Sequence, residues 1–408
     1  MQTAVRKKGK HVFIFNKVRK KCLYLKKNEA MKKFLKVLLL VVLALLLAVT
    51  LAWQGEIRTL STLKQVGDNP YLYTMEYCAS YDLDDVIEKD VDTNSELLNY
   101  VISRVGKGLP IKIQSSQVAD ENGELKTFSC TSFQAKKSDG EGYWYGRNYD
   151  YYKNPTLVTF SHPKKGYASI GVSDMSHIGY GLEKLPTKFL SRINCMAAIY
   201  APVDGINEKG LCTSIMALPK QASQQDTPKH DVGTSMIMRL WLDRCATVEE
   251  ALALLESVDV RHDALVGAGY HYMIADATGH CVVVEFDKDD AWKTIIVRKP
   301  EGQNYMLVTN HLLNPKHYTT EPDIAVGNPH SRSWWRYETA TAFLQAHGGI
   351  LTLDEAQECL AQVHWVDLPI PGDQVEDTQY SNVYDQQNLT LSLRNWNDYN
   401  TTQTFVLK

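Results

Sequence analysis

The chain has 408 residues, a formal net charge of −3 at pH 7 and a pI of about 6.5. This length exceeds a typical single domain and fits one large catalytic domain with additional segments. No internal repeat or low-complexity linker is evident, which argues against a repeat array or a flexible multidomain chain.

The charge is distributed unevenly along the chain. Residues 1–36 contain 13 Lys or Arg and one acidic residue, a net of +12, which leaves 44 − 13 = 31 basic and 47 − 1 = 46 acidic residues, a net of −15. An apolar stretch, 34–53, adjoins the basic region and has about the ~20 residues that a helix needs to cross a bilayer. The basic flank predicts a cytoplasmic N-terminus at 1–33, a signal anchor at 34–53 and an extracytoplasmic body.

The N-terminus can be interpreted in more than one way. Met31-Lys-Lys-Phe-Leu-Lys36 resembles the start of a signal sequence, so Met31 is a second candidate start. Thr50-Leu-Ala52 would suit cleavage of a signal peptide, although we favour a retained anchor in the cell membrane. A nucleic-acid-binding arm is disfavoured, because the basic run directly precedes the apolar span, and no nucleic-acid partner is expected.

Residues 54–129 form a mixed segment ahead of the main run of strands. Apolar residues at helical spacing predict a helix at 95–105, and the polar loop Asp120–Glu124 follows. A hairpin is predicted next, with a strand at 128–135, a turn at Ser138-Asp-Gly140 and a second strand at 143–150.

The rest of the chain alternates in blocks. Further elements are predicted as strands at 197–200, 211–216, 271–276, 281–286 and 305–310, one or two helices within 234–257, helices at 331–347 and 353–363, and a final strand pair. Because strands and helices come in blocks and not in strict βαβ alternation, we expect an α+β fold with separate helix layers.

Cys130 is the strongest candidate for a functional residue. Counting outward from the turn places it opposite the stretch from Arg147 to Asp150, so a thiol would face a guanidinium and a carboxylate. These two residues are an odd number of positions apart, so a regular strand points them to opposite faces. Both would reach the thiol only if a bulge re-aims one of them. A surface ion pair on the hairpin is the plain alternative.

The other cysteines and the histidines indicate no metal or disulfide framework. Seven of the eight cysteines follow the apolar span, an odd number without regular spacing or a Cys-x-x-Cys pair. Cys212 and Cys281 lie in apolar runs typical of small buried side chains. His311 and His317 lack an acidic partner at helical spacing, so no metal and no cofactor are expected.

Six short motifs point to a known family. In chain order they are Thr127-Phe-Ser-Cys-Thr-Ser-Phe133, Gly146-Arg-Asn-Tyr-Asp150, Asp204-Gly-Ile-Asn-Glu-Lys-Gly-Leu211, Val308-Thr-Asn310, Ser333-Trp-Trp-Arg-Tyr337 and Ser381-Asn-Val-Tyr-Asp385. Together, over about residues 128–407, they resemble the choloylglycine hydrolase and penicillin V acylase family. Its members are N-terminal-nucleophile hydrolases of linear amides, related to acid ceramidase and the isopenicillin N acyltransferases. The resemblance implies a four-layer αββα sandwich, with 54–129 as a prosegment or small subunit and 130–408 as the catalytic domain.

The resemblance also implies a catalytic set. Cys130, once N-terminal, would attack through its thiolate, with its own α-amine, of pKa ~7.7–8.0, as the base. Arg147 would hold the thiolate and Asp150 would accept a hydrogen bond from the α-ammonium. Asn310 would offer its side-chain amide to the oxyanion, and Arg336 would complete the charged network. Since only a first residue has a free α-amine, the Ser129–Cys130 bond is expected to be cut.

Some details depart from the family pattern or are ambiguous. Several relatives have a second oxyanion asparagine after the Gly-Leu step, whereas Ser214–Pro219 contains none, so a backbone N–H would serve. Arg332 competes with Arg336, and Asn207 is explained equally well by a turn. The acyl pocket is expected to be lined by residues near the motifs, namely Tyr149, Trp144 and Met216.

Competing functions are compatible with the same residues. A papain-like enzyme would need a histidine, for which His271, His311 and His364 are available, but no papain-type run surrounds Cys130. An acyltransferase or peptidase of the same fold would also fit, as would a catalytically silent membrane-tethered binding protein. We expect an exported amidase that acts on a small-molecule N-acyl amide such as a bile-salt conjugate or penicillin V. Homo-oligomers are compatible with these features.

Overall fold

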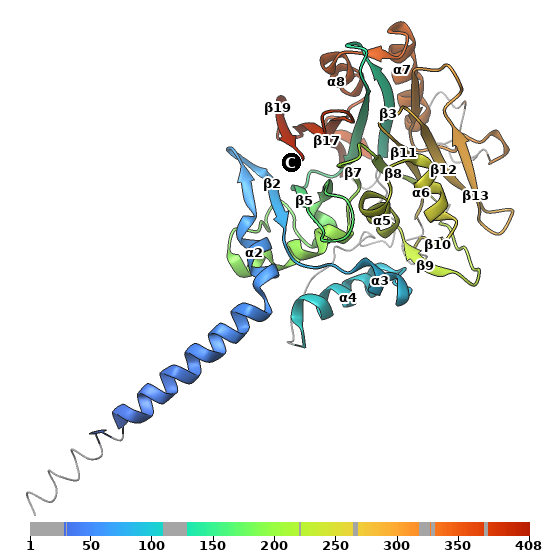
Figure 1. Cartoon of the computed structure of the whole chain (residues 1–408). Coiled ribbons are helices and arrows are strands. Elements are labelled where there is room, and N and C mark those ends of the chain that lie inside the picture. Colours follow the sequence, from blue (N-terminus) through green and yellow to red (C-terminus); the bar gives the residue numbers. More distant parts are fainter. Residues whose placement is uncertain are drawn as a thin grey trace, which may run out of the picture. The chain divides into compact units, whose positions relative to one another are not determined.

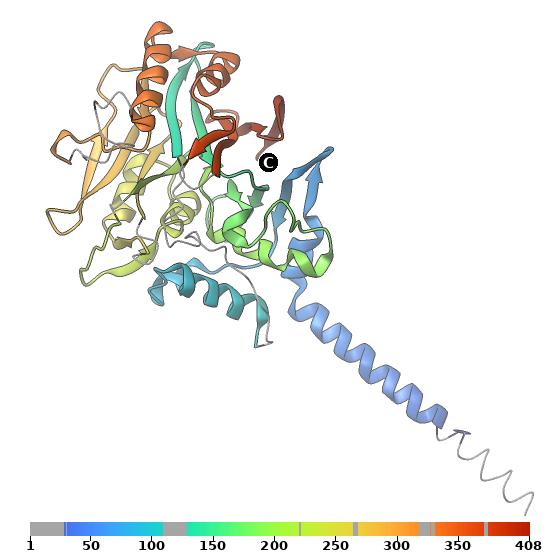
Figure 2. The same ribbon diagram turned by 180° about the vertical axis from the view of Figure 1, so that it is seen from behind.

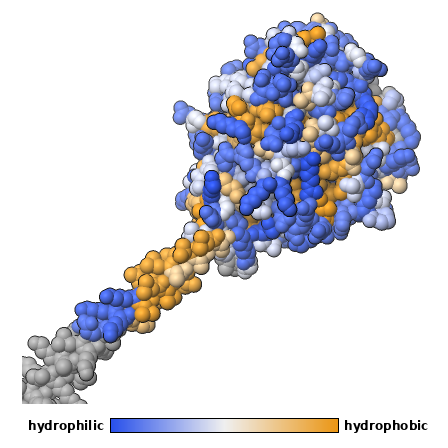
Figure 3. All heavy atoms as spheres, viewed as in Figure 1, coloured by the Kyte–Doolittle hydropathy of each residue, from blue (hydrophilic) through white to orange (hydrophobic). Residues whose placement is uncertain are grey.

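The computed structural model describes residues 28–29, 31–108, 129–219, 222–263, 268–317, 327, 331–370 and 374–408. It divides into two compact units, Met1–Ile57 and Arg58–Lys408. In the first unit, the helix Met31–Ala52 is the one described helix that is long and apolar enough to cross a membrane, with a mean hydropathy of 2.9. Figure 3 shows its apolar band. It is a candidate anchor or signal sequence, and most of the predicted basic region lies outside the described residues.

The second unit contains a nine-stranded sheet. Its strands are ordered β1-β2-β5-β6-β7-β8-β11-β12-β13. Their bounds are β1 Lys64–Val66, β2 Asn69–Tyr77, β5 Thr156–Ser161, β6 Ser169–Asp174, β7 Asp204–Asn207, β8 Cys212–Pro219, β11 Ala268–Ala275, β12 Cys281–Asp287 and β13 Lys293–Arg298. A short parallel pair, β9 His230–Gly233 and β10 Val258–Arg261, stands apart from it.

The second sheet has eight strands and carries the hairpin of Cys130. Its main path is β14-β3-β4-β17-β18-β19, with β15 beside β3 and β16 beside β17. The bounds are β3 Ser129–Lys137, β4 Tyr143–Tyr151, β14 Tyr305–Val308, β15 Ile350–Leu351, β16 Leu368–Ile370, β17 Gln374–Asp385, β18 Thr390–Asn395 and β19 Asp398–Val406.

The two sheets pack face to face between helix layers. Hydrogen bonds join the two sheets directly. Ser214 Oγ on β8 of the nine-stranded sheet lies 2.9 Å from Ser132 Oγ on β3 and 2.5 Å from the Tyr145 hydroxyl on β4. The helices α5 (Met236–Arg244) and α6 (Val248–Leu255) contact the nine-stranded sheet. The helices α7 (Arg332–Ala346) and α8 (Leu353–Ala361) contact the other sheet (Figures 1 and 2). The predicted αββα sandwich is confirmed.

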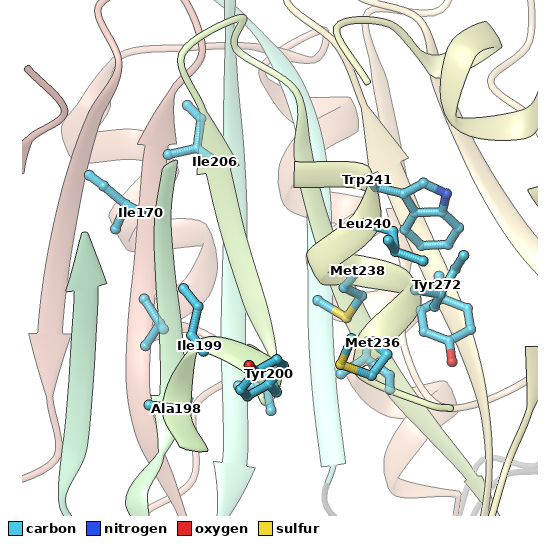
Figure 4. Close-up of a cluster of buried hydrophobic side chains, with 14 of the residues drawn as sticks. Ile170, Ala198, Ile199, Tyr200, Ile206, Met236, Met238, Leu240, Trp241 and Tyr272 are labelled. Carbon is cyan, nitrogen blue, oxygen red and sulfur yellow. The ribbon is translucent and has the colours of Figure 1, made fainter. Parts of the chain in front are cut away.

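The largest hydrophobic core contains side chains of both sheets and of α5, and one part of it lies between α5 and the nine-stranded sheet. Figure 4 shows Leu240 and Trp241 of α5 close to Tyr272 of β11, whereas Ile206 of β7 lies beside Ile170 of β6. The rings of Trp241 and Tyr272 pack edge to face, with their centroids 5.4 Å apart. Trp241 also donates its indole N–H to the carbonyl of Ala251 on α6 at 3.0 Å, so its one polar group is satisfied although it is fully buried.

The segment ahead of Cys130 is built into the sheet. Strand β2 pairs in parallel with β5 along most of its length, and β1 extends the sheet by one more strand. The predicted helix at 95–105 is observed as α4 (Asn94–Gly106), which begins with a capping box between Thr93 and Glu96. The predicted loop Asp120–Glu124 lies outside the described residues.

Most predicted elements of the later chain are present. The regions 234–257, 331–347 and 353–363 form α5 and α6, α7 and α8, each within a few residues of the predicted bounds. The strand predicted at 197–200 is wrong, because these residues end the 3₁₀ helix η2 (Phe189–Tyr200). A short buried apolar run does not distinguish strand from helix by its periodicity. The remaining elements are α2 Gln54–Thr62, α3 Leu83–Glu88, η1 Met175–Ile178 and η3 Pro315–His317.

Candidate active site

The strand register fixes what surrounds Cys130. In the antiparallel pair of β3 and β4, Cys130 lies opposite Tyr149, and Ser132 lies opposite Arg147. Directly opposed residues point to the same face and side chains alternate along a strand, so the thiol shares a face with Arg147. This register is regular from Ser129 to Lys136, and no bulge brings Asp150 to the thiol. The counting from the turn is confirmed, and so is the odd-spacing argument.

On the thiol face, a buried guanidinium is held beside the sulfur. Arg147 donates from Nη2 to the carbonyl oxygen of Ile215 at 2.7 Å, and the Cys130 Sγ lies 3.7 Å from the same oxygen. The Arg147 Nε is 3.7 Å from Asp204 Oδ2. Asp204 in turn accepts hydrogen bonds from three buried side chains, namely Tyr380, Asn382 and Tyr384. The cation is therefore fixed on two sides.

The thiol itself is completely buried in the uncut chain. Burial raises the pKa of Cys130 to about 12, and the nearby Arg147 only partly opposes this shift. The group is thus a neutral thiol at physiological pH in this form. To react as a thiolate, Cys130 must therefore lose its proton to a base.

On the opposite face, Arg336 organises the backbone of Cys130. Its Nη1 donates to the carbonyl oxygen of Cys130 and, at 3.1 Å, to Thr131 Oγ1. Asp150 Oδ2 lies 4.0 Å from the same nitrogen, and the Thr378 hydroxyl donates to Asp150 Oδ1 at 2.6 Å. Burial raises the pKa of Asp150 to about 7, although Arg336 opposes the shift.

The structure distinguishes the two candidate arginines of α7. Ser331 caps this helix by accepting a hydrogen bond from Trp334 N, which sets the start of the helix and turns Arg336 inward, where it is fully buried. Arg332 pairs instead with Glu376 at 3.3 Å, and its side chain is partly exposed. Arg336 is therefore the arginine at Cys130.

Asn310 lies directly at the nucleophile's backbone. Its Oδ1 accepts from the Cys130 N–H at 2.6 Å and from Arg336 Nη2 at 2.8 Å. Its Nδ2 donates to the carbonyl oxygen of Ala217 at 2.9 Å, and its own N–H donates to Ser333 Oγ at 2.8 Å. In the uncut chain this carboxamide therefore positions the backbone of Cys130, and its predicted role at the oxyanion stays a prediction.

Two of the three predicted pocket residues lie at the site. Tyr149 is opposite Cys130 and its hydroxyl lies 3.0 Å from His177 Nε2, while Met216 Sδ is 3.7 Å from Ser132 Oγ. Trp144 is not at the site. It pairs with Ala135 near the turn end of β4 and donates its indole N–H to Leu351 at 2.9 Å. Trp144 was predicted at the site because it is close to Tyr149 in sequence. The two residues are five positions apart on β4, and five residues along a strand span roughly 17 Å.

The histidines that a papain-like enzyme would use have hydrogen-bond partners other than the thiol of Cys130. His271 Nε2 lies 2.8 Å from the carbonyl oxygen of Thr309, and His311 Nδ1 lies 2.9 Å from Ser333 Oγ. His364 Nδ1 contacts the carbonyl of Ala361. Over the part of the chain that the structure describes, no group of three or more His, Cys, Asp or Glu residues is placed to hold a metal ion.

Three supporting residues were not assigned from the sequence. Asp204 and Ser333 are each part of one of the six family motifs, but the motifs alone do not show what these residues contact. In the structure Asp204 holds Arg147 and Ser333 holds Asn310. Thr378 precedes the last motif by three positions and is brought to Asp150 by the pairing of β17 with β4. Asn207 shapes its turn, because its side-chain oxygen accepts from Leu211 N at 3.0 Å.

Comparison with known proteins gives one family and several related folds. Residues 136–397, well over half of the chain, match the family described as acyl-coenzyme A:6-aminopenicillanic acid acyl-transferase. A variant of conjugated bile acid hydrolase from Clostridium perfringens is 17% identical, with 68% of this chain and 92% of that chain covered and a TM-score of 0.50. Penicillin V acylase from Agrobacterium tumefaciens is 16% identical, with 68% and 85% covered and a TM-score of 0.45. The family match includes Arg147, Asp150, Asn310 and Arg336 but begins after Cys130.

Proposed function

The chain belongs to the acyl-coenzyme A:6-aminopenicillanic acid acyl-transferase family, whose name describes the transfer of an acyl group to an amino nitrogen, and we propose that it is a cysteine amidase. It cleaves the linear amide bond of an N-acyl compound through a thioester acyl-enzyme. Its nucleophile is Cys130, after cleavage makes this residue N-terminal. The Met31–Ala52 helix tethers it to the cell membrane, with the catalytic unit outside.

One observation carries this proposal. Cys130 has a cation, Arg147, on its side-chain face and two hydrogen-bonding groups, Asn310 and Arg336, on its backbone N–H and C=O. A cysteine that only packs a core would not need buried charges on both sides, because burying charge is unfavourable. The arrangement holds one residue by every polar atom it has.

The chemistry follows from these contacts. The α-amine freed at Cys130 takes the proton of the thiol, and the thiolate, stabilised by Arg147, attacks the carbonyl carbon of the substrate amide. The tetrahedral oxyanion collapses with breakage of the C–N bond, and the α-ammonium returns its proton to the leaving amine. Water, deprotonated by the same amine, then releases the acyl group as a carboxylic acid and restores the thiol.

The decisive experiment compares two buried cysteines. Cys130→Ala should lower turnover of any N-acyl amide by several orders of magnitude, because the nucleophile is lost. Cys212→Ala is the matched control, since Cys212 is a free cysteine that is equally buried, on β8. Amine release should be assayed on a panel that includes bile-salt conjugates and phenoxyacetyl penicillins. Turnover that survives Cys130→Ala would overturn the proposal.

Acyl transfer is the second candidate, and the family match is the observation that favours it. A thioester reacts with an amine as well as with water, so the outcome depends on which acceptor reaches it. Adding a primary amine during turnover separates the two. Hydrolysis predicts free acid as the product at all amine concentrations, whereas transfer predicts that the new amide replaces the acid as the amine rises.

A further inference from the structure

A short surface segment presents large apolar side chains to solvent. Leu190 is 76% exposed, more than any other large apolar side chain that the structure describes after Ala52. Phe189, beside it, is 45% exposed, and Leu182 is 36% exposed. A soluble surface tolerates single apolar residues, but neighbouring exposed Leu and Phe residues indicate a surface that is covered in use.

The segment is held firmly. The Tyr180 hydroxyl donates to the carbonyl of Ser191 at 2.7 Å, and the backbone N–H of Lys188 donates to Ser191 Oγ at 3.0 Å. Arg192 Nε donates to the carbonyl of Pro186 at 3.3 Å. These bonds tie both ends of the segment together, so the apolar side chains are displayed by a fixed backbone and not by a fraying loop.

A direct bond joins the segment to a residue that follows the apolar helix closely in the chain. Arg192 Nη1 donates to the carbonyl of Leu60 at 3.1 Å. Both views show the green segment that carries η2 next to the C-terminal part of α2 (Figures 1 and 2). Leu60 follows Ala52, the end of the apolar helix, by eight residues. Eight residues span about 12 Å as helix and at most about 29 Å when extended.

The charges beside the apolar residues suit lipid headgroups. Lys184 and Lys188 are exposed, with Glu183 as the one acidic residue among them, whereas the chain after residue 36 is strongly acidic overall. Apolar side chains flanked by lysines are typical of segments that lie in the membrane interface, where lysine stems follow the apolar surface and their ammonium groups reach phosphates.

We propose that this surface rests on the outer face of the bilayer that holds the Met31–Ala52 helix, with its apolar side chains among the lipid headgroups. We call it the membrane patch, which comprises Leu182, Lys184, Lys188, Phe189 and Leu190. The catalytic unit then has a second attachment besides its tether, and this attachment fixes its orientation on the bilayer.

The membrane patch closely follows, in the chain, a residue that contacts the candidate active site. η1 lies just before it in the chain, and His177 of η1 contacts the hydroxyl of Tyr149, the residue opposite Cys130. Resting on the proposed function, this contact points to substrates that partition into the bilayer, namely acyl amides with a long apolar chain. Such a chain would reach the thiol along the segment that touches lipid.

The first experiment measures contact with lipid and does not depend on activity. The full chain with Cys22→Ser, Cys78→Ser and Cys130→Ala retains only cysteines that are buried. A fluorophore is attached at Leu190→Cys, or at Ile350→Cys as the matched control, an exposed residue beside the end of β3 remote from Cys130. In nanodiscs with headgroup-proximal spin-labelled lipids, the label at position 190 should be quenched and shielded from iodide. The proposal would be overturned if iodide quenched the labels at positions 190 and 350 equally and the spin-labelled lipids did not quench the label at position 190.

The second experiment concerns substrate delivery. Phe189→Ser with Leu190→Ser should raise the KM for a long-chain acyl amide presented in vesicles and leave kcat/KM for a short, soluble acyl amide unchanged. An unchanged KM in vesicles would overturn the part that concerns substrates. Loss of activity on both amides would point to the catalytic unit, and the fluorescence measurement would then decide the docking alone.

Discussion

Arg147 and Arg336 lie on opposite faces of the eight-stranded sheet and meet at one residue, Cys130. Arg147 shares the Ile215 carbonyl with the thiol, whereas Arg336 binds the carbonyl of Cys130 and lies within 4.0 Å of Asp150. The site is therefore two buried charge clusters that flank a single strand. One cluster acts on the sulfur and the other on the backbone, so their removal should have different effects.

Variants of Arg147 and Asp204 should affect stability and catalysis differently. Arg147→Leu should destabilise the chain by roughly 3–5 kcal/mol, because Asp204 would remain buried without its cation. Asp204→Asn in the same chain should recover part of this loss, since an amide can still bond Tyr380. Activity should stay low in both, because the thiolate has lost its cation. Urea unfolding and amine release measure the two properties.

The comparison has a clear contrary outcome. If the double variant regains activity together with stability, Arg147 serves only to neutralise Asp204 and has no role at the sulfur. An exposed ion pair shows how much stability is lost when an arginine without a catalytic role is removed. Breaking the exposed Arg298–Glu249 pair by Arg298→Leu should cost only about 0–1 kcal/mol.

Asp150 should make the uncut chain less stable as the pH rises. Its pKa is raised by burial to about 7, against ~3.9 when unfolded, so between these values the folded chain binds more protons than the unfolded one. Its stabilising effect is therefore complete below about pH 4 and is lost as the pH rises through about 7. In Cys130→Ala, Asp150→Asn should flatten this part of the urea midpoint profile. Asp398→Asn, at an exposed position, should not.

The hairpin that carries the site should not tolerate a side chain at Gly146. A Cβ there would lie 2.3 Å from the ring of Phe133, its partner across the strands. Gly146→Ala should therefore cost on the order of 1–3 kcal/mol through overpacking. Gly181→Ala is the matched control, since its Cβ would meet nothing within 4 Å. Equal unfolding midpoints for the two variants would show that the strands separate without strain.

The sequence predicted the hairpin geometry because it depends on local rules. The turn at 138–140 fixes the register, and the period of two along β4 decides which of Arg147 and Asp150 faces Cys130. The superfamily was recognised from six short motifs and is confirmed by the family match and the layered fold. These motifs contain most of the residues that converge on the site.

What the sequence left open or missed concerns contacts between segments that are distant in the chain. The choice between Arg332 and Arg336 depends on how α7 sits on β3 and β14, which no local pattern shows. Trp144 was assigned to the pocket by proximity in sequence alone. Thr378 was missed because its role comes from the alignment of β17 with β4, including the register shift between Thr378 and Tyr380.

The topology is directly testable. The net charges of +12 and −15 on either side of one apolar helix predict that the catalytic unit lies outside the cytoplasmic membrane. Protease added to intact cells should degrade the C-terminal part while a cytoplasmic marker survives. Full protection, with digestion only after permeabilisation, would contradict the prediction. The mass of the N-terminal fragment would distinguish a retained anchor from a cleaved signal peptide.

The last prediction is that the Ser129–Cys130 bond is cut by Cys130 itself. The thiol would attack the carbonyl carbon of Ser129, the peptide nitrogen would leave as the new α-amine, and water would hydrolyse the resulting thioester. The scissile bond lies at the first residues of β3, where the Cys130 N–H is already bonded to Asn310 and its C=O to Arg336. Both groups hold the bond in place as it breaks.

Cleavage would give a C-terminal fragment of 408 − 129 = 279 residues that begins with Cys130. The two pieces should stay together after purification, because β2 of the first piece pairs with β5 of the second inside one sheet. N-terminal analysis should find the new terminus in wild type and in Cys212→Ala, but an intact chain in Cys130→Ala. Asn310→Ala should slow the cut, since it frees the Cys130 N–H. An active wild-type enzyme that remains uncut would require another base, and His271, held by the carbonyl of Thr309, is the first residue to test.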